Sequence, residues 1–226
     1  MDDATRNIIL RAAPGHEWDG IDPTTGFYFR NTSTSAVLRP ISTVNNIELD
    51  GVCFDGSASS GGAFSAENNG DFKSLTNVGM VSVSGDNIPL NISPTLNNVL
   101  IVSPGDDGVI TASACDKVTV VNAPGRGIVT AGGSAITNSF VFGSTGNDFD
   151  DQGGTHSNNA SEDATAMGTG SLTNRTSADF ADFANDDFRT DTNSALATAG
   201  VGGTFIGYAI NTAPGTPIAF SGNIDD

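Results

Sequence analysis

The chain has 226 residues, of which 28 are glycine and 37% are hydrophobic, and its 26 acidic and 9 basic residues give a formal net charge of −17. This length suffices for one large domain with a sizeable core, and the abundance of Gly, Ser, Thr, Asn and Asp favours turns over helix interiors. A surface this acidic repels phosphate groups, which argues against binding to nucleic acid or to an anionic membrane.

Two N-terminal segments have the pattern of strands that end in turns. Residues 7–15 contain an apolar run that ends at Pro14 and Gly15, and residues 46–56 alternate apolar and polar side chains up to Gly56. Alternation with a period of two is typical of a strand with one buried face. The polar stretch 57–62 then predicts a projecting loop. If Met1 is the native start, no signal peptide precedes these strands, which favours a protein that is made in the cytosol and either stays there or leaves it as part of an assembly.

Residues 77–151 contain a repeat of about twenty residues. Four strand-like segments, 77–85, 98–105, 117–125 and 138–146, each end at a glycine, and these glycines are 20, 20 and 21 positions apart. A second, shorter apolar run follows each of them. A strand, a tight turn, a short strand and another turn make up one coil of a parallel β-helix, whose stacked coils bury a continuous apolar column. The sequence therefore predicts an all-β fold, a right-handed single-stranded parallel β-helix.

Strict alternation within this repeat predicts which side chains face the core. The expected inward positions are Val99, Ile101, Val118, Val120, Phe140 and Phe142. A β-sandwich or jelly roll is the alternative, and it requires tight hairpin turns between paired strands. Asn-Gly and Asp-Gly pairs occur at 69–70, 50–51 and 107–108, but they do not alternate with strands as a meander demands. The glycine period therefore favours the solenoid.

Acidic residues gather at the turns of the repeat. Asp106 and Asp148 fall on turns that the glycine period aligns, and Arg126 is the basic residue within those turns. Glycosidases act through two carboxyl groups, and polysaccharide lyases need a base beside acidic ligands. These three residues are therefore the catalytic candidates if the chain is an enzyme. The alternative is structural, because Asp favours turns in the absence of any catalytic role.

Three of these carboxylates also form a candidate cation site. Asp148, Asp150 and Asp151 offer the clustered oxygen ligands that Ca²⁺ takes, although their spacing matches neither an EF-hand loop nor a glycine-rich calcium repeat. Phosphate-binding and nucleophile-elbow motifs are absent from the sequence, and two histidines and two cysteines are too few for a zinc centre. Beyond Ca²⁺ at this cluster, the sequence predicts no cofactor.

The chain divides at residue 152. Residues 1–152 are expected to form the β-helix, with its regular coils at 77–151, and residues 153–226 a polar loop, terminal strands and a C-terminal cap or docking segment. In that segment Phe205, Ile206, Tyr208 and Ile210 lie in an alternating run. Such a run would either cap an open end of the stack or pair with a neighbouring chain, and a homotrimer is compatible with an exposed stack end.

Several segments resemble a known group of proteins. Residues 8–16, with Ala-Pro-Gly at 13–15 and Trp-Asp-Gly at 18–20, resemble the first coil of pectate-lyase-like, right-handed parallel β-helix proteins. Residues 158–170 and 183–189, followed by Ser-Ala at 194–195, are similar to the closing part of uncharacterised phage and prophage members. Residues 200–226 depart from that pattern, which usually continues with an Asp-rich Asp-Gly-Arg motif.

The resemblance implies a structural component of a phage virion, assembled in the host cytoplasm. Such a component would be a capsid decoration protein or a fibre or spike element that binds other capsid or tail proteins, or a glycan of the host surface. The same group includes tailspike-type polysaccharide depolymerases and lyases as well as glycan-binding adhesins, and these are the alternatives. A fold supports many functions, so the choice among them depends on the site.

Overall fold

The computed structural model describes residues 8–12, 28–30, 47–55, 72–81, 95–111, 114–130 and 132–209. In this part the chain forms a parallel β-solenoid with about three complete turns, which confirms the predicted all-β parallel architecture. Short 3₁₀ turns are the only helical elements among the described residues: η1 (Ser177–Asp179), η2 (Phe183–Asn185), η3 (Ala195–Ala197) and η4 (Val201–Gly203). None of the described elements is a helix long and apolar enough to cross a membrane.

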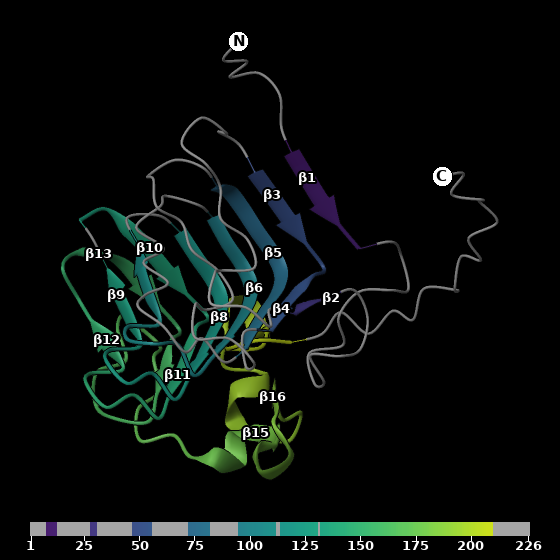
Figure 1. Ribbon diagram of the computed structural model, residues 1–226. Helices are drawn as coiled ribbons and strands as arrows, with labels where there is room; N and C mark the ends of the chain where they lie inside the picture. The colour runs from purple at the N-terminus through teal and green to yellow at the C-terminus, as the bar shows by residue number, and fades with distance from the viewer. Residues whose placement is uncertain are drawn as a thin grey trace, which may run out of the picture.

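Seven parallel strands form the path of the main sheet and lie side by side in Figure 1. They are β1 (Ile8–Arg11), β3 (Ile47–Asp50), β5 (Phe72–Val81), β6 (Thr95–Val102), β8 (Ala114–Val121), β10 (Ser134–Thr137) and β13 (Gly154–Ser157). Four short strands extend this sheet: β2 (Tyr28–Arg30), β4 (Cys53–Asp55), β11 (Phe140–Phe142) and β14 (Ala160–Ser161). A second parallel sheet contains β7 (Val109–Thr111), β9 (Ile128–Thr130) and β12 (Phe149–Asp150).

A bend with left-handed backbone recurs in five successive coils of the main sheet. Asn77, Asn98, Lys117, Asn138 and Asn158 all have φ between 50° and 56°. Asn adopts this conformation more readily than most residues with a side chain. The four predicted strands began at the first four of these residues, but β5, β6 and β8 begin several residues earlier, before the bend. The bends therefore lie inside the long strands.

The repeat length explains how these bends stack. Paired residues lie 21, 19, 21 and 20 positions apart, from Val78 to Val99, Val99 to Val118, Val120 to Val141 and Phe140 to Ala160. At the bends, the side-chain amide of Asn98 donates to Asn77 Oδ1 at 2.8 Å, and that of Asn138 donates to Asp116 Oδ1 at 2.7 Å. These hydrogen bonds tie neighbouring coils together at one edge.

Columns of apolar side chains fill the inside of the stack. Leu75, Leu96, Cys115 and Ile136 form one column, in which each residue is fully or almost fully buried. A second column consists of the residues directly after each bend. In it Val78 pairs with Val99, and Val99 with Val118, so the predicted inward positions of Val99 and Val118 are confirmed. Ile101 and Val120 are inward as well. Burial of this kind, at about 25 cal/mol per Å² of apolar surface, is the main stabilising contribution in a solenoid.

The prediction that Phe140 and Phe142 face inward is wrong. Val141 pairs with Val120 and belongs to the inner core, whereas Phe140 pairs with Thr119 on the outer face. In each coil the residues one and three positions after the bend face inward, and after Asn138 these are Ser139 and Val141. Alternation therefore holds when it is counted from the bend, and the predicted residues Phe140 and Phe142 lie one position off it, which puts them on the opposite face.

The stack extends beyond the boundary predicted at residue 152 and ends in a cap loop, residues 162–172. β13 pairs with β10, and β14 pairs with β11. Asn159, which is fully buried, occupies an inward position of the last coil. It accepts from the Ser139 N–H at 3.0 Å and donates to the carbonyls of Ile136 and Met167 at 3.0 and 2.9 Å. A hydrogen-bonded polar layer therefore closes the apolar column.

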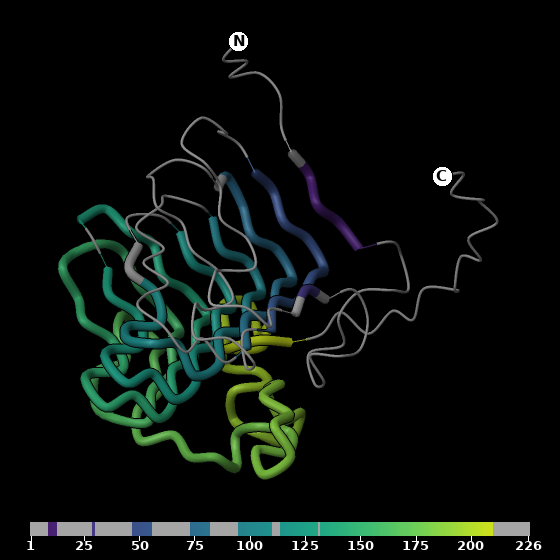
Figure 2. The backbone as a smooth tube through the Cα atoms, viewed as in Figure 1, coloured from purple at the N-terminus to yellow at the C-terminus, as the bar shows by residue number. Residues whose placement is uncertain are grey.

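A C-terminal segment, residues 173–209, packs against the outer face of the main sheet. Its antiparallel hairpin, β15 (Phe180–Asp182) and β16 (Asp187–Thr190), lies below the sheet in Figure 1. Phe140 stacks on Phe180 at a ring-centroid distance of 4.9 Å. The yellow end of the tube in Figure 2 then runs back across the coils. A second apolar cluster therefore lies outside the solenoid and not within it.

Candidate functional site

The turns between the two sheets bring charged residues of three successive coils together. Asp107, Arg126 and Asn147 stack in register because Val109 pairs with Ile128, and Ile128 with Phe149. The backbone comes close at the neighbouring Gly127, where a Cβ atom would lie 2.5 Å from the Asp148 carbonyl oxygen. Glycine is therefore required there for the coils to stack, and the stacking places side chains of the turns at one edge.

Arg126 is held between two carboxylates from the coils on either side. Its guanidinium donates to both oxygens of Asp107, at 3.1 and 2.5 Å, and to Asp150 Oδ2 at 2.6 Å. These hydrogen bonds raise the pKa of Arg126. Burial would raise the pKa of Asp107, but the hydrogen bonds from Arg126 outweigh it and lower that pKa overall. Arg126 thus bridges three coils as a permanent cation.

Asp106 and Asp148 lie on stacked turns of two coils, but two positions out of register with each other. Asp106 is exposed and lies opposite Gly125, while Asp148 follows two positions later in the turn of another coil, opposite Gly127. One position of this offset is present in the sequence, because Asp106 follows Gly105 directly and Asp148 is the second residue after Gly146, and the 19-residue step between the coils of Asp106 and Arg126 adds the other. The structure therefore brings Arg126 to Asp107 and Asp150 instead of to the pair predicted for catalysis.

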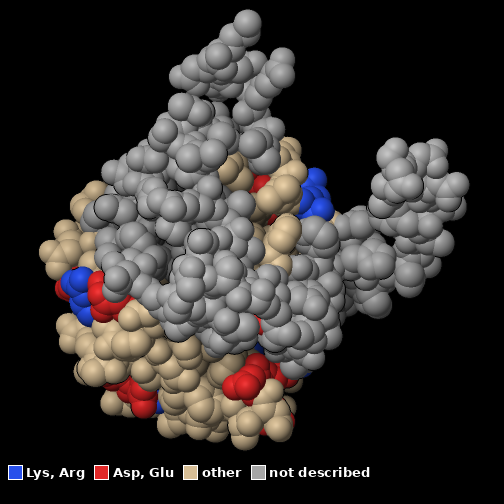
Figure 3. Space-filling model, viewed as in Figure 1, with Lys and Arg blue, Asp and Glu red and all other residues tan. Residues whose placement is uncertain are grey.

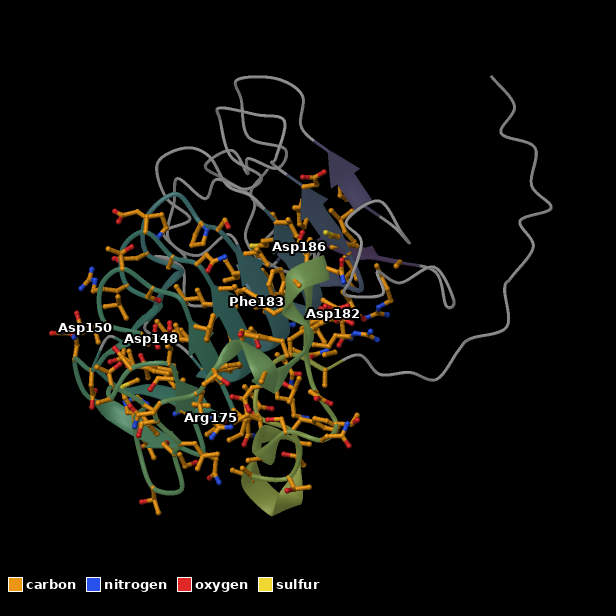
Figure 4. All side chains as sticks on the ribbon, turned by 90° about the horizontal axis from the view of Figure 1, so that it is seen from below. Asp148, Asp150, Arg175, Asp182, Phe183 and Asp186 are labelled. Carbon is orange, nitrogen blue, oxygen red and sulfur yellow. The ribbon has the colours of Figure 1, made fainter. Side chains whose placement is uncertain are left out.

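Asp148 is almost entirely buried, at 2% exposure, and faces the cap loop. Its Oδ2 accepts from the backbone N–H groups of Glu162 and Asp163, at 2.7 and 3.2 Å. Burial and the nearby charge of Asp163 raise the pKa of Asp148 to about 6, against the opposing effect of these two hydrogen bonds. Figure 4 places Asp148 and Asp150 at the turn edge, far across the view from Asp182 and Asp186 of the hairpin.

The three carboxylates predicted to bind Ca²⁺ have different partners. Asp150 binds Arg126 and also accepts from the Gln152 side chain at 2.9 Å. Asp151 accepts from the Gly153 N–H at 2.7 Å and lies 3.3 Å from His156 Nε2. Within the part of the chain that is described, no group of three or more His, Cys, Asp or Glu side chains converges as a metal site would require. A cation bound here would have to compete with Arg126.

The residues predicted as interface candidates lie in the C-terminal segment. Ile206 and Tyr208 are 0% and 2% exposed, and both pack in the outer cluster against the chain's own sheet. Tyr208 N–H donates to Thr119 Oγ1 at 2.6 Å. Ile210 lies outside the described residues. The apolar side chains of Ile206 and Tyr208 are therefore buried against the chain's own sheet in this structure.

Phe205, the remaining candidate, is half-buried and borders a cavity of about 340 Å³ between β16 and the end of the C-terminal segment. Arg189, Asp191 and Thr192 also line this cavity. Two hydrogen bonds from its side chain hold Arg189 on Asp187. The cavity thus combines an aromatic ring with a guanidinium, a carboxylate and a hydroxyl group, and its volume lies at the lower end of the range for small-ligand sites.

Two polar groups were missed in the sequence. Asp163 accepts from the Asp148 N–H at 3.1 Å and from both the N–H and the hydroxyl of Thr165, and these hydrogen bonds lower its pKa although burial alone would raise it. Asp179 is paired with Arg175 at 2.5 Å. The four-residue spacing of Arg175 and Asp179 in the sequence was a signal from which this ion pair could have been predicted. The pairing of Asp148 with Asp163 was not, because it depends on how the cap loop folds back.

Acidic side chains outnumber basic ones among the described residues. On the face drawn in Figure 3, red side chains gather at the lower right, while blue groups at the left edge lie beside red ones. Comparison of the chain with protein families, with curated proteins and with solved structures finds no match. The features of this chain that bear on function are therefore its parallel β-solenoid and the charged side chains of its turns.

Proposed function

We propose that this chain is a structural, non-catalytic component of a phage virion, a capsid decoration protein or a fibre or spike element. One observation carries the structural part of the proposal. Arg126 was the candidate cation of a catalytic site, but its guanidinium forms ion pairs with Asp107 and Asp150 of the two neighbouring coils. Side chains at the turn edge thus serve to hold coils in register, which is what a rigid scaffold requires.

The association with a virion is supported by the resemblance of residues 8–16, 158–170 and 183–189 to phage-type β-helix proteins. In this proposal the chain is assembled in the host cytoplasm and binds other capsid or tail proteins, alone or as a homotrimer. The large excess of acidic over basic residues suits a contact with a basic region of such a protein.

The test is to find the chain in particles. An antibody raised against the purified chain is applied to density-gradient fractions of particles released from cells of the source organism. We expect the chain in the particle fraction at a fixed ratio to the major shell protein. A chain found only in the soluble fraction, or only as unassembled protein, contradicts the virion assignment. Light scattering of the purified chain tests the homotrimer separately.

A depolymerase or lyase of tailspike type is the second candidate. The observation that favours it is the pair Asp148 and Asp163, whose pKa values are moved in opposite directions, as in acid–base pairs. The burial of Asp148 stands against it, because a substrate would have to open the cap loop first. Release of reducing ends or unsaturated products from a panel of capsular polysaccharides, lost in Asp148→Asn, would establish this activity.

Glycan binding without turnover is the third candidate, and the cavity beside Phe205 favours it. A half-buried aromatic ring next to Asp191 and Thr192 offers a stacking surface with polar groups around it. Binding to a glycan array that is lost in Phe205→Ala, with unfolding unchanged, would support an adhesin. Binding that survives the substitution would exclude this cavity as the site.

A further inference from the structure

At the edge of β12, the cap loop closes the C-terminal end of the solenoid through side chains. β12 has β9 as its strand partner on one side only. On the other side the Asp148 N–H donates to Asp163 Oδ2 at 3.1 Å, and the Phe149 N–H donates to Thr165 Oγ1 at 2.9 Å. Side-chain oxygens of the cap loop therefore occupy the place that the next strand would take. This arrangement protects the last strand from pairing with another chain.

Asp148 and Asp163 bind each other's backbone. Asp148 Oδ2 accepts from the Asp163 N–H, and Asp163 Oδ2 accepts from the Asp148 N–H. Asp148 is 2% exposed, so its charge has little water around it. Two negative charges placed this close in a buried site repel each other, and the pair is more stable when one of the two holds a proton.

From this geometry we propose that the cap loop is a pH-operated closure of the solenoid's C-terminal end, tightened when the paired carboxyl groups of Asp148 and Asp163 hold one proton and loosened when both are ionised. The inference does not depend on the proposed role in a virion. It concerns the stability of one loop on the stack and the exposure of the strand edge beneath it.

The sign follows from the two pKa shifts. Asp148 has its pKa raised from 3.8 to about 6 in the folded chain, so its contribution to closure is fully present below about pH 4 and is lost as the pH rises through 6. Asp163 has its pKa lowered, so its contribution is lost as the pH falls below its usual range near 4. The cap loop is therefore tightest in mildly acid solution, between these two limits.

Other charged groups near Asp148 have partners of their own. Glu162 accepts from the Gly143 N–H at 2.8 Å, and Arg126 on the preceding turn binds Asp107 and Asp150. Asp151 lies 3.3 Å from His156 Nε2 and forms a second pair of titratable groups. A variant of Asp148 separates the effect of its own pair from that of His156.

Closure can be measured by amide hydrogen exchange on the full chain, followed by mass spectrometry from pH 4.5 to 7.5 and corrected for the pH dependence of intrinsic exchange. For peptides covering 158–172 we expect the opening equilibrium to rise roughly tenfold per pH unit up to about pH 6 and then to level off. Peptides of β6 and β8 should not show this change. Cap-loop protection that is constant across this range overturns the proposal.

Asp148→Asn keeps an oxygen to accept from Glu162 and Asp163 but removes the charge, so the cap loop should stay closed at pH 7.5 and lose its pH dependence. Asp106→Asn, on an exposed turn, is the matched control and should titrate like the parent chain. If Asp148→Asn fails to fold, Asp163→Asn replaces it, and its transition should move to lower pH because the repulsion is gone. If the variant that folds shows the same pH transition of cap-loop exchange as the parent chain, the pH effect comes from other groups and the proposal is overturned.

Discussion

The solenoid stack and the C-terminal segment are stabilised by contacts of very different range along the chain. In the stack, each strand pairs with the one about twenty residues away, so the same bends and columns recur. In the C-terminal segment, the backbone N–H groups of Val201, Tyr208 and Ala209 bind side chains of the stack 63, 89 and 111 residues back. The first kind of contact repeats in the sequence, whereas the second does not.

The difference explains an irregularity in the repeat. Outward-facing residues of a solenoid are usually polar, yet Leu100, Val121 and Phe140 face outward and are buried at 0–1% exposure. They are apolar because the C-terminal segment covers them. An apolar outward position in an otherwise alternating strand thus indicates that another part of the structure covers that face.

The largest expected effect comes from separating the two regions at Phe140. Phe140→Ala removes a fully buried ring that packs on Phe180, and we expect it to cost about 3–5 kcal/mol. The loss should fall on the C-terminal segment, because the ring belongs to the outer cluster. Limited proteolysis should then cleave within 173–209 at denaturant concentrations where the stack remains protected.

Val141→Ala is the matched comparison, since Val141 is the next residue and faces the inner core. We expect a cost of about 2 kcal/mol, expressed as weaker protection of β8 and β11 in hydrogen exchange. If both substitutions release the same segment, the two clusters are not separate cooperative units and the comparison fails.

Asp179 tests the polar anchoring of the C-terminal segment. Burial would raise its pKa, but hydrogen bonds from Arg175, Ser194 and the Thr176 N–H lower it overall. Asp179→Asn should therefore destabilise the segment by about 2 kcal/mol at pH 7, because a buried acceptor loses its ionic partners. Since the pKa is lowered by folding, the parent chain should lose this contribution only as the pH falls through 4 and below, and the variant should show a smaller acid effect. Equal acid sensitivity in parent and variant would count against this anchor.

The inner structure could be predicted from the sequence much further than the outer segment could. The bends at Asn77, Asn98 and Asn138 begin the repeated segments, and the inward valines follow from alternation. The inward position of Val141 follows when alternation is counted from the bend at Asn138, but the outward position of Phe140 was not visible because an apolar ring there requires cover by a distant segment of the chain. The pairing of Asp148 with Asp163 required the path of a loop whose side chains replace a strand, and no periodicity encodes that.

A close approach of the two regions can be tested at Gly207. It has a φ of 87°, and a Cβ atom there would lie 2.9 Å from Thr119 Oγ1 and 3.0 Å from Thr190 Oγ1. Gly207→Ala combines backbone strain with a clash and should cost about 2 kcal/mol. Gly202→Ala has a similar φ of 70° with nothing within 4 Å of the new methyl group, so it should cost about 1 kcal/mol. Urea unfolding gives the loss in free energy of unfolding for each variant, and the difference between the two losses is the cost of the clash with the stack. Equal losses would show that backbone strain alone accounts for both.

The smallest effect is expected at Arg126, although this residue has the most ionic partners among the described side chains of the turns. Its side chain is 40% exposed, and water and salt screen the bridges to Asp107 and Asp150. Arg126→Ala should therefore cost about 1 kcal/mol, and Arg126→Lys should recover only part of it because an ammonium cannot bind both oxygens of Asp107 in the same way. The loss should shrink as NaCl is raised and should be confined to amides of the turns, with protection of residues 173–209 unchanged. Release of the C-terminal segment in Arg126→Ala would mean that the turn edge and the outer cluster are coupled, and the division of the molecule into two regions would have to be abandoned.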